Sequence, residues 1–263
     1  MNDSKIIKVI KFITMRKTVF TLAVLLVSAV LADEALAQYT VKAGYTLATQ
    51  TAKLKEDNST YKEDPFNMSG IYLGASYEFP LLSKSWGDIS VNPGLTYSFY
   101  GKTVADESET IAGVKTSARE CIYEHYLDLP VHGKYTYTLI PGKLKLSGYA
   151  GPVLSFGLAS TNVSRIKAGD NWAVERVNNY NGNSRSRSEY NGEKSSEKHK
   201  GIGSDYSMFD LKFTLGVSAN LFDMADFCIG YDFGLLDRYT DPKGGSKTIF
   251  HTHILRIGFA YSF

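Results

Sequence analysis

Cysteine is scarce in this sequence, and neither sign of charge is in excess. Only Cys121 and Cys228 occur among 263 residues, and no CxxC pattern or Cys/His cluster is present, so the sequence offers no zinc site. Five of the 29 Lys and Arg residues and three of the 27 Asp and Glu residues lie before residue 38, which leaves 24 of each beyond it. A balanced charge gives no reason to expect a nucleic-acid partner. We expect no metal and no other cofactor.

Long apolar runs are also missing, apart from residues 18–32 (TVFTLAVLLVSAVLA). These 15 residues are short for a membrane helix, which needs roughly 20. A basic stretch from Met15 to Lys17 precedes them, and ALA at 35–37 follows. The pattern predicts a secretory signal peptide over 1–37, cleaved before Gln38, with Met15 as an alternative start. An uncleaved anchor helix is the other interpretation. Residues 38–263 are then one domain.

What the sequence does contain is 18 Tyr, 14 Phe and 23 Gly, a mixture that favours strands and turns. Residues 209–221 (FDLKFTLGVSANL) place apolar side chains on one face and polar or small ones on the other, with the period of two that marks a strand. Most such segments reach 12 residues, against about five or six in soluble proteins. There are eight of them, at 38–49, 68–80, 88–102, 120–138, 143–159, 206–222, 225–239 and 250–263.

The connections between these segments alternate in length. Those at 81–87, 139–142 and 223–224 are short, whereas those at 50–67, 103–119, 160–205 and 240–249 are long and polar. Bacterial outer-membrane barrels have short periplasmic turns and longer outside loops. Apolar outward faces require lipid, and closure of the sheet removes edges that lipid cannot hydrogen-bond. The sequence therefore predicts an all-β fold in the outer membrane, an eight-stranded antiparallel transmembrane up-and-down β-barrel surrounded by lipid.

The opposite faces of the strands would supply the lumen with charge. An eight-stranded barrel is just wide enough to be filled by side chains, and unpaired buried charges are costly. We therefore predict a plugged lumen, with Asp210, Lys212, Asp232 and Arg256 in one network; a gated or narrow conduit for small solutes is the alternative. The inward register collects Lys42, Glu78, Lys102, Glu124, Asp128, His132, Lys134, Lys145, Asp210, Lys212, Asp232, Arg238 and Arg256.

Two further features test the register. Pro130 interrupts a strand that otherwise alternates well, so we predict a bulge or a missing ladder bond there, and Pro93 and Pro152 raise the same question. Cys121 and Cys228 fall at opposite ends of the barrel, beyond the Cα separation of about 7 Å that a disulfide allows. We predict two unpaired thiols, unless a register error brings them together.

The last ten residues, ILRIGFAYSF, form the closing strand of the predicted barrel. Phe259, Tyr261 and Phe263 lie on its lipid-facing side, and Arg256 points into the lumen. This terminal pattern resembles the signal that the outer-membrane barrel assembly machinery reads, which makes that machinery an expected partner.

The stretch YLDLPVHGKY (126–135) resembles a strand of the outer-membrane β-barrel proteins of Bacteroidota, the porin-family or PorT-like group. Four other stretches resemble the same family in order, so the likeness covers nearly all of 38–263. It implies an eight-stranded barrel with long surface loops and no particular activity, although some PorT-like members are linked to protein secretion. The four stretches are VNPGLTYSFYGK (91–102), LSGYAGPVLSFG (146–157), FDLKFTLGVSANL (209–221) and IGYDFGLLDRY (229–239).

We expect a non-enzymatic role in envelope structure, surface interaction or limited solute passage. The segment 160–205 is the best candidate to contact a surface ligand, although its composition also suits a solvated, partly disordered loop. Trp172 and Val174 could instead extend the flanking strand. A lipid or peptide hydrolase is the remaining alternative, without a G-x-S-x-G motif to support it. Its candidate residues at the outer rim are Glu124, His125, Asp237, Asp241, His251 and His253.

Overall fold

The computed structural model describes residues 38–56, 59–111, 113–201, 206–239 and 246–263. The predicted signal peptide and its cleavage site lie outside these residues. No described helix is long and apolar enough to cross a membrane. The strands are β1 (Gln38–Glu56), β2 (Ser59–Lys62), β3 (Phe66–Lys84), β4 (Gly87–Ile111), β5 (Val114–Ile140), β6 (Leu144–Ala168), β7 (Asn171–Asn178), β8 (Ser184–Tyr190), β9 (Glu193–His199), β10 (Phe209–Leu221), β11 (Ala225–Gly234) and β12 (Ser246–Ser262).

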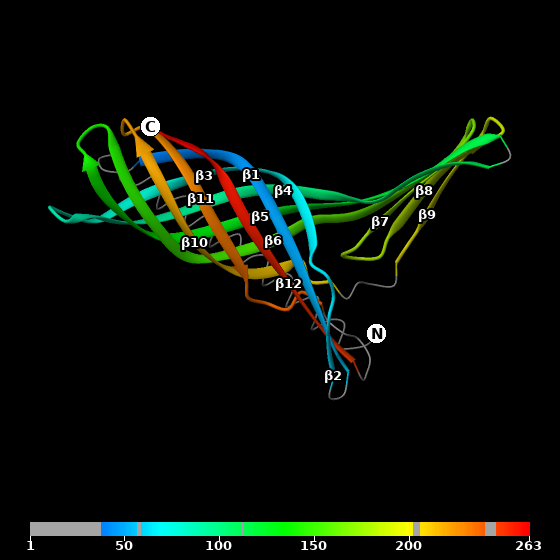
Figure 1. Ribbon diagram of the computed structural model, residues 1–263, viewed down its shortest axis with the longest axis horizontal. Coiled ribbons are helices and arrows are strands. Elements are labelled where there is room, and N and C mark those ends of the chain that lie inside the picture. Colours follow the sequence, from blue (N-terminus) through cyan, green and yellow to red (C-terminus); the bar gives the residue numbers. More distant parts are fainter. Residues whose placement is uncertain (1–37, 57–58, 112, 202–205, 240–245) are drawn as a thin grey trace, which may run out of the picture. The chain divides into compact units, whose positions relative to one another are not determined.

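Eight of these strands close into a ring. The hydrogen-bonded order is β1, β3, β4, β5, β6, β10, β11 and β12, and β12 pairs with β1 to complete the circuit (Figure 1). The closing pair runs without interruption from Thr40 opposite Ser262 to Glu56 opposite Ser246. The prediction of an eight-stranded antiparallel barrel is therefore confirmed, with each of the eight predicted segments in its own strand.

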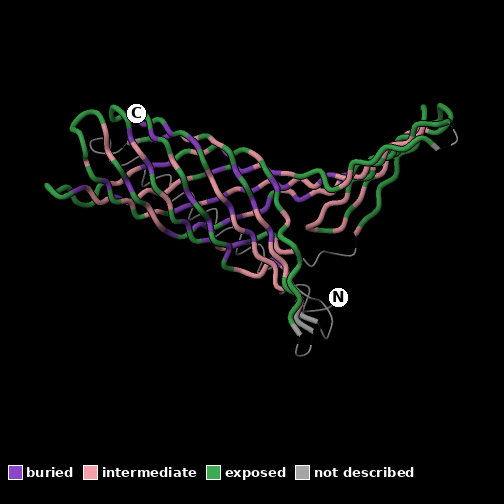
Figure 2. The backbone as a smooth tube through the Cα atoms, in the orientation of Figure 1, coloured by how far each residue is buried: buried purple, intermediate pink, exposed green. Residues whose placement is uncertain are grey.

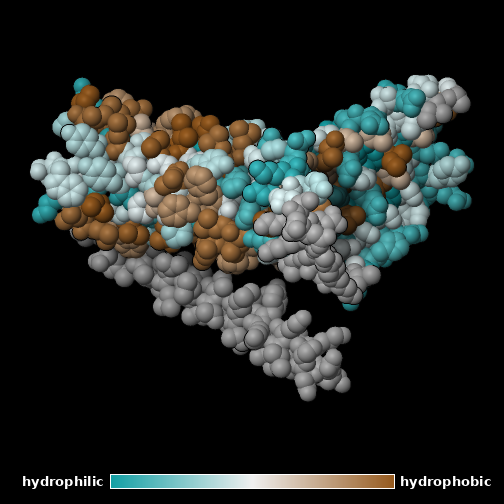
Figure 3. All heavy atoms as spheres, turned by 60° about the horizontal axis from the view of Figure 1, so that its bottom comes forward, coloured by the Kyte–Doolittle hydropathy of each residue, from teal (hydrophilic) through white to brown (hydrophobic). Residues whose placement is uncertain are grey.

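The two faces of the ring differ in the way that a lipid-embedded barrel requires. Ile71, Leu73 and Val217 point outward and are 62%, 58% and 60% exposed, whereas Asp128 and Lys212 point inward and are almost completely buried. Purple, buried positions alternate with exposed ones along the ring strands in Figure 2. The face shown in Figure 3 carries hydrophobic residues over the ring and mainly hydrophilic ones toward β7–β9. Water would make such an exterior unstable, and lipid makes it favourable.

The four predicted long loops are wrong in part, because the structure forms strands there. Residues 50–56 continue β1, 59–62 form β2, and β12 begins at 246. Residues 103–111 continue β4, 114–119 belong to β5, and 160–199 contain the end of β6 with β7, β8 and β9. The residues beyond the ring, 105–111 of β4, 114–121 of β5, 161–168 of β6 and the whole of β7, β8 and β9, pair in this order. We call this six-stranded extension the outward sheet. Trp172 and Val174 lie in β7, which pairs with β6.

Proline interrupts the ladder of the ring without shifting its register. Pro130 lies opposite Val153, and pairing with β6 resumes only at Gly133 opposite Ala150, in the same register. The ladder therefore has a gap beside Pro130, as we predicted, because proline has no N–H to donate. No bulge accompanies this gap. Pro93 borders a matching gap between β4 and β5. Pro152 lies inside the gap between β5 and β6, but pairs opposite Phe213 in an unbroken ladder with β10. Cys121 and Cys228 are both free.

Candidate functional site

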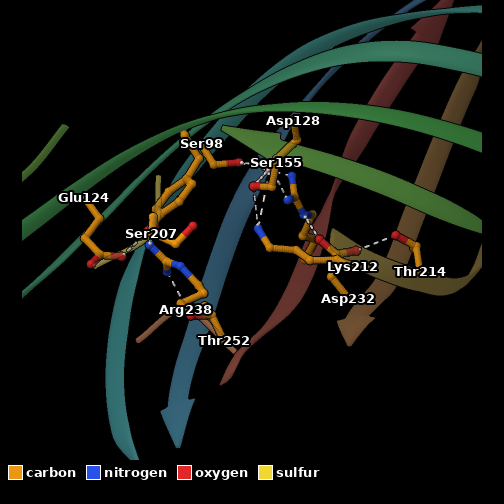
Figure 4. A network of polar contacts seen from close by, with 12 residues as sticks. Ser98, Glu124, Asp128, Ser155, Ser207, Lys212, Thr214, Asp232, Arg238 and Thr252 are labelled. Carbon is orange, nitrogen blue, oxygen red and sulfur yellow. Dashed lines mark hydrogen bonds and ion pairs between the residues drawn. The ribbon is translucent and has the colours of Figure 1, made fainter. Parts of the chain in front are cut away.

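An ion-pair network crosses the middle of the lumen (Figure 4). Arg256 of β12 donates from Nε to Asp232 Oδ2 at 2.8 Å and from Nη2 to Asp128 Oδ2 at 2.6 Å. Its third nitrogen, Nη1, donates to Ser98 Oγ at 3.1 Å. One guanidinium therefore joins three strands of the ring, because its fork of donors can bind several oxygens at once.

Lys212 of β10 completes this network. Its Nζ donates to Ser155 Oγ at 2.8 Å and lies 3.5 Å from Asp128 Oδ1. Ser155 in turn donates to Asp128 Oδ1 at 2.5 Å, and Thr214 donates to Asp232 Oδ1 at 2.7 Å. Two carboxylates thus balance two cations, and each carboxylate also accepts a hydroxyl hydrogen bond. The central network, defined as Ser98, Asp128, Ser155, Lys212, Thr214, Asp232 and Arg256, draws on six of the eight ring strands.

A second polar cluster surrounds Glu124 nearer the long-hairpin end of the lumen. Its Oε2 accepts hydrogen bonds from Tyr126 Oη at 2.9 Å and from Gln50 Nε2 at 3.1 Å, and its Oε1 accepts one from Ser160 Oγ at 3.2 Å. Glu124 is 2% exposed. Three donors on three strands hold this buried carboxylate in place.

Arg238 lies beside this cluster, fully buried. Its guanidinium carbon is 4.4 Å from the ring centre of Tyr206 and 5.0 Å from that of Tyr126, and Nη1 donates to Thr252 Oγ1 at 3.0 Å. Desolvated cation–π contacts stabilise this arginine, which forms no ion pair with a carboxylate among the described residues. We predicted Arg238 in a strand, but β11 ends at Gly234, so this residue reaches the lumen from the following connection.

Tyr180 closes over the same end from the turn between β7 and β8. Its hydroxyl donates to Tyr126 Oη at 3.3 Å, and its ring lies 6.0 Å from that of Tyr206. A β-carbon at Gly157 would overlap the Tyr180 hydroxyl, so only glycine allows this approach. Burial raises the pKa of Tyr180 and of Tyr206, so both phenols stay neutral. The tyrosine predicted to lie in a loop therefore helps to cover the mouth of the ring.

Smaller ion pairs lie toward the short-turn end of the lumen. Lys134 Nζ contacts Glu78 Oε2 at 2.8 Å, and Ser90 donates to Glu78 Oε1 at 2.6 Å. Lys145 pairs with Asp223 at 2.8 Å in a partly exposed position at the turn. Neither ion pair includes a residue of the central network.

A cavity of about 100 Å³ lies between the central network and this end. Lys42, His132, Tyr149 and Cys228 line it together with Asp232 and Arg256 of the network. The Nε2 atom of His132 is buried without a partner in the described chain. The space is large enough for a few waters and too small for a sugar or a peptide.

The predicted network of four residues is partly wrong. Lys212, Asp232 and Arg256 meet as predicted, but neither carboxylate oxygen of Asp210 has a hydrogen-bond partner among the described residues. Asp128 from β5 takes the place of Asp210 between the two cations. Lys102 also departs from the prediction, because it is exposed and its Nζ lies 4.3 Å from the ring centre of Phe66. The two serines of the network were missed, although both carry the inward period.

The residues considered for a hydrolase do not assemble. Glu124 points into the lumen, whereas its neighbour His125 lies on the outward face against Phe99 at 4.9 Å, because successive strand residues face opposite ways. His251 bonds the Leu236 carbonyl at 3.1 Å, and Asp237 Oδ1 accepts the amides of residues 239 and 250. His253 stacks on Tyr231. Asp241 lies outside the described residues. Across the described ranges, no histidine bonds a serine, and no group of acids, His and Cys could hold a metal.

The three aromatic residues of the terminal pattern occupy one line at the end of the chain. Phe259, Tyr261 and Phe263 are 69%, 47% and 72% exposed, all on the outward side of the closing strand. The amide of Phe263 donates to the Tyr39 carbonyl at 2.9 Å. The C-terminal end of the chain therefore takes part in closing the ring.

The chain was also compared with known proteins. Among solved structures, Ail of Yersinia pestis is 14% identical, with 87% of this chain and 100% of Ail covered and a TM-score of 0.32. Neisserial surface protein A is 13% identical, with 87% and 100% covered and a TM-score of 0.34, and OprG of Pseudomonas aeruginosa is 11% identical, with 86% and 96% covered and a TM-score of 0.34. Among curated proteins, no match was found.

A family model described as outer membrane protein beta-barrel domain matches residues 32–239, which is well over half of the chain. The closed ring, its lipid-facing exterior and this match agree on location as well as on fold. The chain belongs to the outer membrane protein beta-barrel domain family and resides in the outer membrane.

Proposed function

We propose that this protein is a non-enzymatic outer-membrane barrel with a closed lumen, which holds the outward sheet at the cell surface for contact with a ligand. The central network carries the proposal. Arg256 bridges Asp128 and Asp232 across the lumen, and Lys212 contacts Asp128 from another strand. A solute would have to separate these buried ion pairs to pass.

The network is stable because its charges are balanced and its oxygens are hydrogen-bonded. Breaking a buried ion pair by removing one partner costs about 3–5 kcal/mol, since the other charge stays unpaired. Transient opening by thermal motion would meet a barrier of the same origin. The Glu124 and Arg238 clusters add a second polar layer nearer the outer mouth.

Planar-bilayer recording on the purified, refolded protein tests the closed lumen. We expect no steady unitary conductance from the native protein. A variant that combines Asp128→Ala, Asp232→Ala and Arg256→Ala should conduct, because it removes three long side chains from the narrowest layer. Steady conductance of the native protein would overturn the closed lumen. A change of ion selectivity after Lys42→Glu would then support a narrow conduit through the cavity that Lys42 lines.

We also propose that the protein belongs to the Bacteroidota porin-family or PorT-like group, on the resemblance of YLDLPVHGKY (126–135) and the four stretches in order with it. A role in a secretion machine requires a stable partner. Native purification in mild detergent should then yield a larger complex, and a monomer in every detergent would count against that role.

A further inference from the structure

The outward sheet sorts its charges by sign between its two faces. Residues directly opposite in neighbouring strands share a face, so the register assigns every side chain. One face, the basic face, carries nine cations and two acids, namely Lys115, Arg119, Arg165, Lys167, Arg176, Arg185, Arg187, Lys194 and Lys198 with Asp106 and Glu189. The other, the acidic face, carries six acids and neither Lys nor Arg, namely Glu107, Glu109, Glu120, Glu175, Glu193 and Glu197.

Like charges even lie side by side on the basic face. Arg176 of β7 is opposite Arg185 of β8, which is opposite Lys198 of β9. Arg119 of β5 is likewise opposite Arg165 of β6. Directly opposed like charges destabilise a sheet, so stability of the sheet itself does not explain this arrangement.

The basic face has few counter-charges of its own. Arg119 contacts Asp106 at 3.5 Å, and Lys194 contacts Glu189 at 3.9 Å. Among the described residues, the other seven cations have no ion pair, and all nine are exposed to solvent. The Glu residues that could neutralise them by alternating along each strand lie on the opposite face instead.

A hollow of about 590 Å³ lies over the row of three cations. Arg176, Arg185 and Lys198 line it together with Thr161 and Asn178 of the same face. Its remaining lining residues are Asn183, Ser184, His199 and Lys200, of which Ser184 and His199 belong to the acidic face by register. Guanidinium groups bind sulfate and carboxylate oxygens in pairs, and amides and hydroxyls exchange hydrogen bonds with sugar hydroxyls. The hollow therefore offers both kinds of contact that a charged sugar needs.

We infer that the basic face of the outward sheet binds a linear anionic polysaccharide, laid across β7, β8 and β9 with its sulfate or carboxylate groups on Arg176, Arg185 and Lys198. Neighbouring strands are about 4.8 Å apart, so a chain crossing them meets a cation at each strand. This inference rests on the proposed surface role and names the ligand class.

A polysaccharide fits this face better than a single-stranded nucleic acid does. Nucleic-acid grooves combine cations with aromatic side chains on which bases stack. Trp172 is the one aromatic residue on the basic face in the described strands, and its indole donates to Glu189 at 3.1 Å. Short turns face the periplasm in this class of barrel, so the long hairpins that build the sheet face outside, where extracellular polysaccharides occur.

Binding to immobilised full-length protein in detergent micelles tests the inference. The probes are dextran sulfate, alginate as a carboxylated chain, neutral dextran and an oligo-deoxythymidine. We expect salt-sensitive binding of dextran sulfate or alginate, whichever group the site prefers, and no binding of neutral dextran. Equal binding of neutral dextran, tighter binding of the oligonucleotide, or no binding of either anionic polysaccharide would overturn the proposal.

A triple variant, Arg176→Ser, Arg185→Ser and Lys198→Ser, should weaken binding at least about tenfold and lower the slope of log affinity against log salt by about 2 to 3. The matched control changes the other face, with Glu120→Gln, Glu175→Gln and Glu197→Gln, and should bind at least as tightly as the native protein. Retained heat-modifiable mobility in electrophoresis shows that each variant is folded. Equal loss in both triple variants would contradict a face-specific site.

The outcomes are separable from those of the closed lumen. A barrel that shows no conductance and binds neither anionic polysaccharide overturns only the ligand assignment. A conducting barrel that binds them overturns only the closed lumen.

Discussion

The lumen and the outward sheet contain the same charged residue types and arrange them in opposite ways. In the lumen, Arg256 contacts two aspartates within 2.8 Å, and Lys212 approaches Asp128. In the sheet, Arg185 stands between Arg176 and Lys198 without an acid partner among the described residues. A low-dielectric interior requires each charge to find its opposite, whereas water screens neighbours of like sign. Charges of like sign can therefore be neighbours only outside the ring, where they are available to bind a ligand.

Removal of one partner from the central network should show the largest difference between the two regions. Asp128→Ala leaves Arg256 and Lys212 short of a buried carboxylate and should lower the free energy of unfolding by about 3–5 kcal/mol. Urea titration of the protein folded into lipid vesicles measures this. Asp106→Ala, which removes an exposed acid next to Arg119, should cost at most about 1 kcal/mol. Similar losses in both variants would erase the distinction.

A lysine substitution at an exposed apolar position should cost more stability where the position faces lipid than where it faces water. Leu215 lies at the middle of β10 on the outward side of the ring, and Leu215→Lys should destabilise the barrel by about 2–4 kcal/mol. Ile166 is similarly exposed but lies on the acidic face of the sheet, where Ile166→Lys should change the free energy of unfolding by no more than about 0.5 kcal/mol. The same urea titration applies, and a tolerated Leu215→Lys would argue against lipid at that height.

Removal of a single hydroxyl should lower the free energy of unfolding in the lumen and leave it nearly unchanged in the sheet. Ser155 donates to Asp128 and accepts from Lys212, so Ser155→Ala should cost about 1–3 kcal/mol by leaving buried charges less well bonded. Ser188→Ala in β8 is the matched control and should stay within about 0.5 kcal/mol of the native protein. Unfolding midpoints with unchanged slopes would establish that stability alone has changed.

The eight ring strands could be predicted from the sequence because apolar side chains recur every second residue, as in 209–221. The strands β7 to β9 were missed because they carry few apolar residues; in β8 the period of two appears only as charge against serine, in SRSRSE at 184–189. That alternation is the signal that could have revealed β8. It reads as a loop when only apolar residues are counted.

The partners within the lumen could be narrowed but not fixed from the sequence. Period-two alternation shows that Asp128 and Asp210 both face inward, and it says nothing of their heights along the barrel. Strand tilt and stagger determine which inward residues meet, and these depend on the whole closed ring. Lys212 consequently pairs with Asp128 across strands rather than with the nearby Asp210 on its own strand.

The smallest expected effect concerns the repulsion stored in the sheet. Arg185→Ser removes the cation between Arg176 and Lys198 and should stabilise β7–β9 locally by about 0.2–1 kcal/mol at low salt. Amide hydrogen exchange of these strands measures the gain. In roughly 1 M salt, where the Debye length is about 3 Å, the gain should vanish. A gain that persists there would have a cause other than charge.

The strands β5 and β6 both run from the ring into the sheet, and this has a mechanical consequence. At about 3.3 Å per residue, the 27 residues of β5 span roughly 90 Å, about three times the thickness of the hydrocarbon core. Tension applied to a bound polymer would load the backbone hydrogen bonds between these strands in shear, along most of their length. Shear distributes force over many bonds at once, so a pull at the tip of the sheet would be borne by the barrel wall.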